Sequence, residues 1–135
     1  MTAEEKKVYL SQYISLGDMI ELRLEEIARL EALATKVTPT LSDMPKGGNG
    51  TSRLENVMDR LIDLQLELGS NIQEAIRIRK HIGHAINEMP TERYKVCLYM
   101  RYILGKTWVE ISEKLQCEER WAYKIHRKAL EEIEI

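Results

Sequence analysis

The chain has 135 residues, and 20 Lys and Arg residues against 22 Asp and Glu residues give it a formal net charge of −2. This length and charge fit one or two small domains of an ordinary soluble protein and exclude a large catalytic α/β domain. With only 7 Gly and 3 Pro residues, the composition favours long helices over strands. The sequence has neither a secretory leader nor the run of about 18 apolar residues that spans a membrane. We therefore expect a cytoplasmic protein without a membrane partner.

The first predicted element is an amphipathic helix over residues 3–37. Its apolar residues recur at spacings of three and four between Glu and Arg residues, which is typical of a helix with one buried face. They are Leu16, Ile20, Leu24, Ile27, Leu30, Ala34 and Val37. Residues 38–52 contain two Pro and three Gly residues, so we expect a loop there.

The second predicted element is a helix over residues 53–88 with an almost uninterrupted heptad pattern. Its seam consists of Leu54, Val57, Leu61, Leu64, Leu68, Ala75, Ile78, Ile82, Ala85 and Met89, with Asn71 as the one polar member. At 1.5 Å per residue each long helix would measure roughly 50 Å, so the two can pair as an antiparallel hairpin. A two-helix hairpin has little core of its own, and we therefore expect a homo-oligomer, with a dimer favoured.

Pro90 marks the expected boundary between the hairpin, residues 1–89, and a C-terminal domain, residues 90–135. Three helices are predicted after it, over residues 91–104, 108–115 and 118–133, with Gly105 ending the first of them. Thr107 and Glu110 have the spacing of a capping box at the start of the short middle helix. The whole chain is therefore predicted to be all-α, a long helical hairpin followed by a compact three-helix domain.

The last two predicted helices carry the pattern that points to a function. A short helix, a turn of about three residues and a second helix are the parts of a helix-turn-helix DNA reader, whose second helix enters the major groove. The second helix carries Arg120, Lys124, Arg127 and Lys128 within nine residues and without an acidic residue between them. The alternative is a solvated helix face balanced by nearby Glu residues.

A resemblance to known families supports the DNA-binding interpretation. The run LYMRYILGKTWVEISEKLQCEERWAYKIHRKAL, residues 98–130, resembles region four of bacterial sigma-70-type factors. The whole chain, on YLSQY, TPTLSDMP and RYILGKTWVEI, is similar to a family of small phage and prophage proteins grouped with sigma-like phage transcription regulators. The resemblance implies a regulatory role on double-stranded DNA in a bacterial host cell, with host RNA polymerase as a further partner.

The resemblance also implies which residues contact DNA. Base-edge contacts fall on the exposed first turns of the last helix, at Glu119, Arg120, Trp121, Tyr123 and Lys124. Phosphate contacts fall at the start of the preceding helix, at Lys106, Thr107 and Trp108, and further along the last helix, at Arg127 and Lys128. The sequence departs from the sigma pattern at Gln116, where a turn Gly is usual, at Glu118, where a Ser N-cap is usual, and at Trp121 and Tyr123, where basic residues are usual. Arg101 and Glu110 are expected to form a structural ion pair.

The sequence gives less support for other classes of function. We expect no enzyme, because the sequence lacks a Gly-rich phosphate loop, a nucleophile elbow and a metal signature. His81 and His84 stand three residues apart without a third ligand, and Cys97 and Cys117 have no metal-binding spacing, so no metal or other cofactor is expected and both thiols should be reduced core residues. Two alternatives to a transcription regulator stay open. One is a DNA-packaging subunit of the small-terminase kind, and the other is a protein adaptor that does not bind DNA.

Overall fold

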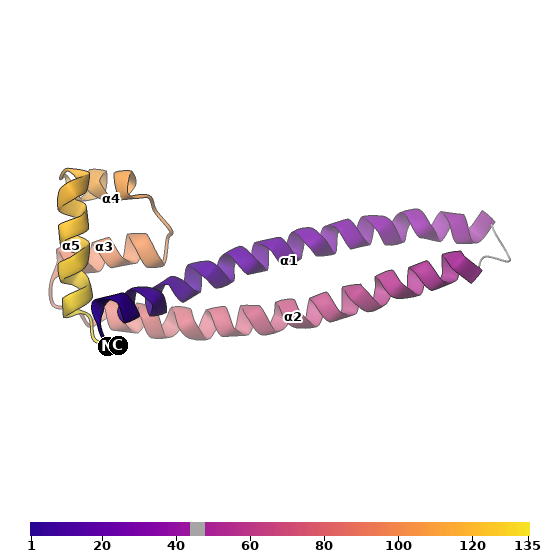
Figure 1. Cartoon of the computed structure of the whole chain (residues 1–135), viewed down its shortest axis with the longest axis horizontal. Coiled ribbons are helices and arrows are strands. Elements are labelled where there is room, and N and C mark those ends of the chain that lie inside the picture. The colour runs from indigo at the N-terminus through magenta and orange to yellow at the C-terminus, as the bar shows by residue number, and fades with distance from the viewer. Residues whose placement is uncertain (44–47) are drawn as a thin grey trace. The chain divides into compact units, whose positions relative to one another are not determined.

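The computed structural model describes the backbone of residues 1–43 and 48–135 and the side chains of residues 1–36 and 52–135. Every regular element in these residues is a helix, as the all-α prediction requires (Figure 1). The helices are α1 (Ala3–Asp43), α2 (Gly48–Asn87), α3 (Glu92–Tyr102), α4 (Trp108–Leu115) and α5 (Glu119–Glu132). In the described part of the chain, none of them combines the length and the apolarity that crossing a bilayer requires. The chain forms two compact units, one of residues 18–73 and the other of residues 1–17 and 74–135.

The unit of residues 18–73 is a pair of antiparallel helix segments. Arg23 of α1 forms an ion pair with Glu67 of α2, and Glu26 pairs with Arg60 at 3.3 Å. The partner's residue number falls as the α1 number rises, so the two segments run in opposite directions. The seam between them is apolar, as the heptad pattern predicted, and its buried side chains are Ile27, Leu61 and Leu64.

Two details of the predicted hairpin are wrong. Leu24 was assigned to the buried face of the first helix, but its side chain is 51 % exposed, and its neighbour Arg23 instead contacts α2 through Glu67. The predicted loop, residues 38–52, is also too long, since α1 continues to Asp43 and α2 already begins at Gly48. A helix that is already nucleated adds residues cooperatively, so single Pro and Gly residues near its end shorten it less than composition suggests. Residues 44–47 of that segment lie outside the described part of the chain.

The second unit brings the ends of the long helices together with the C-terminal helices. Its main core joins α1, α2, α3 and α5 through Leu10, Ile78, Ile82, Ala85, Ile86, Met89, Leu98, Tyr102, Ile103, Ala129, Leu130 and Ile133. The compact units thus divide the chain differently from a boundary at Pro90, because the apolar faces of α1 and α2 pack against α3 and α5 at this end. The roles assigned to residues 1–89 and 90–135 stay predictions.

A smaller core lies among α3, α4 and α5, and each of these helices packs against the other two. Its buried members are Cys97, Ile111, Ala122 and Ile125, and Cys117 packs against them. Both thiols are free. Burial raises the pKa of Cys97 to about 12, which makes this thiol an unreactive core side chain. The predicted helix boundaries here hold to within two residues.

Candidate nucleic-acid interface

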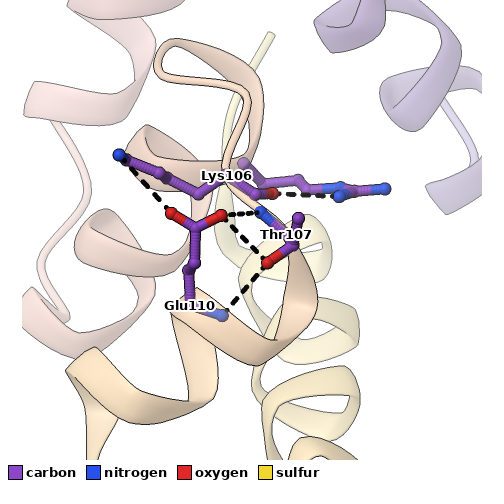
Figure 2. A network of polar contacts seen from close by, with 4 residues as sticks. Lys106, Thr107 and Glu110 are labelled. Carbon is purple, nitrogen blue, oxygen red and sulfur yellow. Dashed lines mark hydrogen bonds and ion pairs between the residues drawn. The ribbon is translucent and has the colours of Figure 1, made fainter.

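The start of α4 is fixed by the predicted capping box (Figure 2). The Thr107 hydroxyl accepts a hydrogen bond from the Glu110 backbone N–H at 3.2 Å, and the Glu110 carboxylate accepts one from the Thr107 N–H at 3.3 Å. The Lys106 ammonium lies 3.5 Å from the same carboxylate. The hydrogen bonds from Thr107, and to a lesser extent Lys106, lower the pKa of Glu110. The box satisfies N–H groups at the helix start that would otherwise lack partners.

A tight turn, residues 116–118, joins α4 to α5. Gln116 adopts the left-handed conformation, with φ of 55° and ψ of 49°, although this position favours glycine. The Cys117 N–H donates to the Ser112 carbonyl at 3.0 Å and closes the turn. Ser112 is 6 % exposed, as expected for a small side chain where the two helices meet, and its hydroxyl donates to the Val109 carbonyl.

The inward face of α5 fixes how the helix is rotated. Its buried apolar side chains are Ala122, Ile125, Ala129 and Leu130. The end of α5 has no basic residue in its own last turn, but the Lys6 ammonium of α1 donates to the carbonyls of Leu130 at 2.9 Å and Ile133 at 2.8 Å. A cation at this end of a helix satisfies free carbonyls and interacts favourably with the negative end of the helix dipole.

The outward face of α5 is basic. Arg120, Lys124, Arg127 and Lys128 are all exposed, and among the residues that the structure describes they enter no ion pair. The Lys124 ammonium lies 4.5 Å from the centre of the Trp121 ring, a cation–π contact. Trp121 itself is 53 % exposed. Glu119 and Tyr123 are exposed on the same helix, so the structure brings all predicted base-contacting residues to the surface of one helix.

Three of the predicted phosphate-contacting residues have partners inside the protein. Lys106 faces Glu110, and the Thr107 hydroxyl belongs to the cap. The half-buried Trp108 ring lies 4.7 Å from the ring of Tyr123, between centroids, and 4.6 Å from the Arg101 guanidinium carbon. Trp108 therefore packs as part of the small core, and a role of these three residues in DNA binding stays a prediction.

The predicted ion pair of Arg101 with Glu110 is wrong. Arg101 lies over the Trp108 ring and donates to the Lys106 carbonyl at 3.0 Å. Glu110 instead interacts with Lys106 and Thr107. Arg101 does connect α3 to the start of α4, as expected, whereas Glu110 contacts only residues at the start of its own helix.

A groove of about 540 Å³ runs along α5 on its α3 side. Its lining combines an apolar floor, Tyr94 and Ile125, with basic side chains at the rim and the exposed Trp121. The basic residues are Arg93, Lys124, Arg127 and Lys128, and one carboxylate, Glu131, lies among them. Arg93 and Tyr94 were not predicted as site residues, because only the packing of α3 against α5 brings them beside the basic helix.

A buried pair on the inner side of α5 was also not predicted. The Tyr102 hydroxyl and the His126 Nε2 are 2.6 Å apart and hydrogen-bonded, and the His126 side chain also contacts the edge of the Trp108 ring. Burial, with further contributions from Lys7 and Arg101, lowers the pKa of His126 to about 4. Burial raises the pKa of Tyr102 to about 12. Both groups are therefore neutral near pH 7.

One of the two histidines of α2, His81, contacts a side chain of α1. The His81 Nδ1 is hydrogen-bonded to the Tyr9 hydroxyl, and the two rings meet edge to face. In the described part of the chain no group of three or more His, Cys, Asp or Glu residues is placed to hold a metal ion.

A family model described as a protein of unknown function, DUF1492, matches residues 36–134. The chain belongs to this family. The DUF1492 match includes α2 to α5 in full, so the turn between α4 and α5 and the basic face of α5 lie within it. The chain matches no curated protein. It also matches no solved structure.

Proposed function

We propose that this chain is a DNA-binding transcription regulator of the sigma-factor-like kind, encoded by a phage or prophage, and that α5 enters the major groove of duplex DNA. One observation carries the proposal. Four exposed cations without ion-pair partners in the described structure lie on α5, the second of two helices joined by a three-residue turn. This is the arrangement in which helix-turn-helix proteins present a recognition helix.

For DNA binding, the local charge of the outward face of α5 matters more than the net charge of the whole chain. The net charge of −2 does not attract DNA, but binding depends on the phosphates that local Lys and Arg side chains neutralise. The four cations of α5 have no counter-charge in the described structure, although eight Glu side chains occupy the same C-terminal segment, residues 91–135, so they are available to phosphates. The unpaired cations favour DNA contact over a solvated helix face.

The residues divide into two roles in this proposal. Arg120 and Lys124, near the N-terminus of α5, reach base edges together with Glu119, Trp121 and Tyr123, and Arg and Lys donors suit the acceptor atoms of guanine. Arg127 and Lys128 contact phosphates of the DNA backbone. Lys106, Thr107 and Trp108 at the start of α4 contact phosphates as well. Because Lys106 is already paired with Glu110, we expect it to contribute less than the cations of α5.

The helical pair has a supporting role in the proposal. A homo-oligomer, first of all a dimer, would hold two DNA-reading helices at a fixed spacing, which increases the affinity for paired sites. Docking of the same helices on host RNA polymerase would instead bring the polymerase to the bound DNA. Both arrangements place the sequence preference in α5.

The test is a titration of fluorescent duplexes, tiled from the DNA that flanks the gene, at two salt concentrations. We expect salt-weakened binding that prefers one tile over a scrambled duplex. The variant Arg120→Ala with Lys124→Ala should bind the preferred tile at least about tenfold more weakly and lose most of its preference over the scrambled duplex. The control Arg53→Ala with Lys80→Ala removes two exposed α2 cations and should bind as the wild type does. No binding at low salt would reject the proposal and favour a protein adaptor, and equal binding by the α5 variant would reject α5 as the DNA-reading helix.

A further inference from the structure

The groove on the α3 side of α5 has the composition of a site for an acidic, partly apolar partner. Its floor is formed by Tyr94 and Ile125, and the exposed Trp121 stands beside it. Trp, Tyr and Arg are the side chains that most often anchor protein interfaces. A DNA backbone would match the basic rim, but it offers no apolar side chain for this floor.

The rim of the groove carries an excess of positive charge. Arg93 donates a hydrogen bond to the Leu115 carbonyl at 3.3 Å, which leaves its charge without a counter-charge in the described structure. Arg127 and Lys128 have no ion-pair partner there either, and Lys124 faces only the Trp121 ring. Glu131 is the one carboxylate of the lining. The groove therefore attracts several carboxylates together.

The unit of residues 18–73 carries a surface of the opposite kind on α2. Met58, Ile62 and Leu66 are 45 %, 52 % and 70 % exposed, and spacings of four place them on one side of the helix. Large apolar side chains exposed in a row are typical of an interaction surface.

Carboxylates accompany this apolar row. Glu55, Asp59 and Asp63 lie three or four residues from its members, are exposed, and enter no ion pair in the described part of the chain. We call the six α2 residues the acidic face: Glu55, Met58, Asp59, Ile62, Asp63 and Leu66.

We propose that the groove beside α5 binds the acidic face of a second copy of this chain. The contact pairs unpartnered carboxylates with unpartnered cations, and it covers exposed apolar side chains with an apolar floor. Neither surface finds such a partner in the compact unit to which it belongs. Because every copy carries both surfaces, association is head to tail and depends on protein concentration. This contact is distinct from the seam between α1 and α2.

Sedimentation velocity of the full chain without DNA, over a range of concentrations, tests the contact. Wild-type protein should associate. A groove variant, Arg93→Glu with Lys128→Glu, and a face variant, Asp59→Lys with Asp63→Lys, should each raise the dissociation constant at least about tenfold. An equimolar mixture of the two variants should associate again, because the unchanged groove of the face variant matches the unchanged face of the groove variant, and the two reversed surfaces also match each other.

The control is Asp18→Lys with Glu21→Lys, which makes the same charge change at exposed α1 positions outside the acidic face and should associate as the wild type does. A wild type that stays monomeric, or variants that fail to recover on mixing although circular dichroism shows them folded, would overturn the proposal. An effect of the face variant alone would show that α2 pairs with α2 and would also overturn it. Arg120 does not line the groove, so failure of DNA binding in Arg120→Ala leaves this test unaffected.

Discussion

Protonation of His126 is predicted to destabilise the C-terminal helices in mild acid. His126 is 8 % exposed, and its imidazole packs against Tyr102 and Trp108, with Lys7 and Arg101 adding positive potential. Burial lowers its pKa to about 4 from the ordinary histidine value of 6.5, which applies to the unfolded chain. The folded state therefore excludes a proton that the unfolded state binds.

The direction and the size of the effect follow from this difference. Above pH 6.5 both states are neutral at His126, and its contribution to stability is fully present. As the pH falls below 6.5 the unfolded state takes up the proton first, so the free energy of unfolding decreases, by at most about 2 kcal/mol at pH 5 and about 3 kcal/mol at pH 4. Below the folded-state pKa the loss levels off, because both states are then protonated.

Urea unfolding followed by circular dichroism at pH 7, 6 and 5 measures the effect. Glutamine at position 126 keeps a hydrogen-bonding group for the Tyr102 hydroxyl but does not titrate. Between pH 7 and pH 5 the wild type should therefore lose about 2 kcal/mol more than the variant His126→Gln. Parallel pH profiles for the two proteins, or a pKa of His126 at or above 6.5 in an NMR titration, would refute the reasoning.

Three further predictions concern the turns around α4, and urea unfolding checks each against the wild type. Thr107→Ala removes the capping hydroxyl and should lower the free energy of unfolding by about 1 kcal/mol, and an unchanged value would mean that the cap is replaced by solvent. Gln116→Gly relieves the backbone strain of a non-glycine residue in the left-handed conformation, with φ of 55°, and should raise the free energy of unfolding by about 1 kcal/mol. A lower free energy of unfolding would contradict the strain argument. Gly105→Ala should lower it by about 1 kcal/mol or more, because φ is 66° and the new Cβ would lie 3.4 Å from Ile14 Cδ1. A neutral result would show that this turn adapts.

Local patterns in the sequence predicted local structure well. The spacing of Thr107 and Glu110 was enough for the capping box, because both partners lie within one helical turn. The heptad pattern of α2 placed Leu61 and Ile82 in cores correctly, since a period close to that of the helix fixes one face along its whole length. Periodicity failed at Leu24, which is exposed, whereas its neighbour Arg23 makes a long-range ion pair with Glu67 that no spacing rule predicts.

The parts of the site that were missed all depend on contacts between distant segments. Lys6 reaches the end of α5 from 124 residues away in the chain, and no spacing rule connects the two. Tyr102 and His126 meet only after α3 has packed on α5, and Arg93 joins the groove for the same reason. The Arg101 prediction failed because charge alone does not distinguish a carboxylate partner from an aromatic ring and a backbone carbonyl.

The proposed DNA face and the proposed groove for a second copy share cations, and this overlap gives a prediction that neither proposal makes alone. Lys124, Arg127 and Lys128 line the groove and also belong to the proposed DNA face. Carboxylates of a second copy and phosphates of a duplex then compete for them, so a short duplex should break the contact between the groove of one copy and the acidic face of another. Sedimentation with a labelled duplex measures this directly. The variant Arg120→Ala binds DNA more weakly but keeps the groove, so its assembly should resist the same duplex concentration. If the assembly persists intact at a saturating duplex concentration, the DNA face and the surface that binds the second copy are separate, and the second copy binds away from α5.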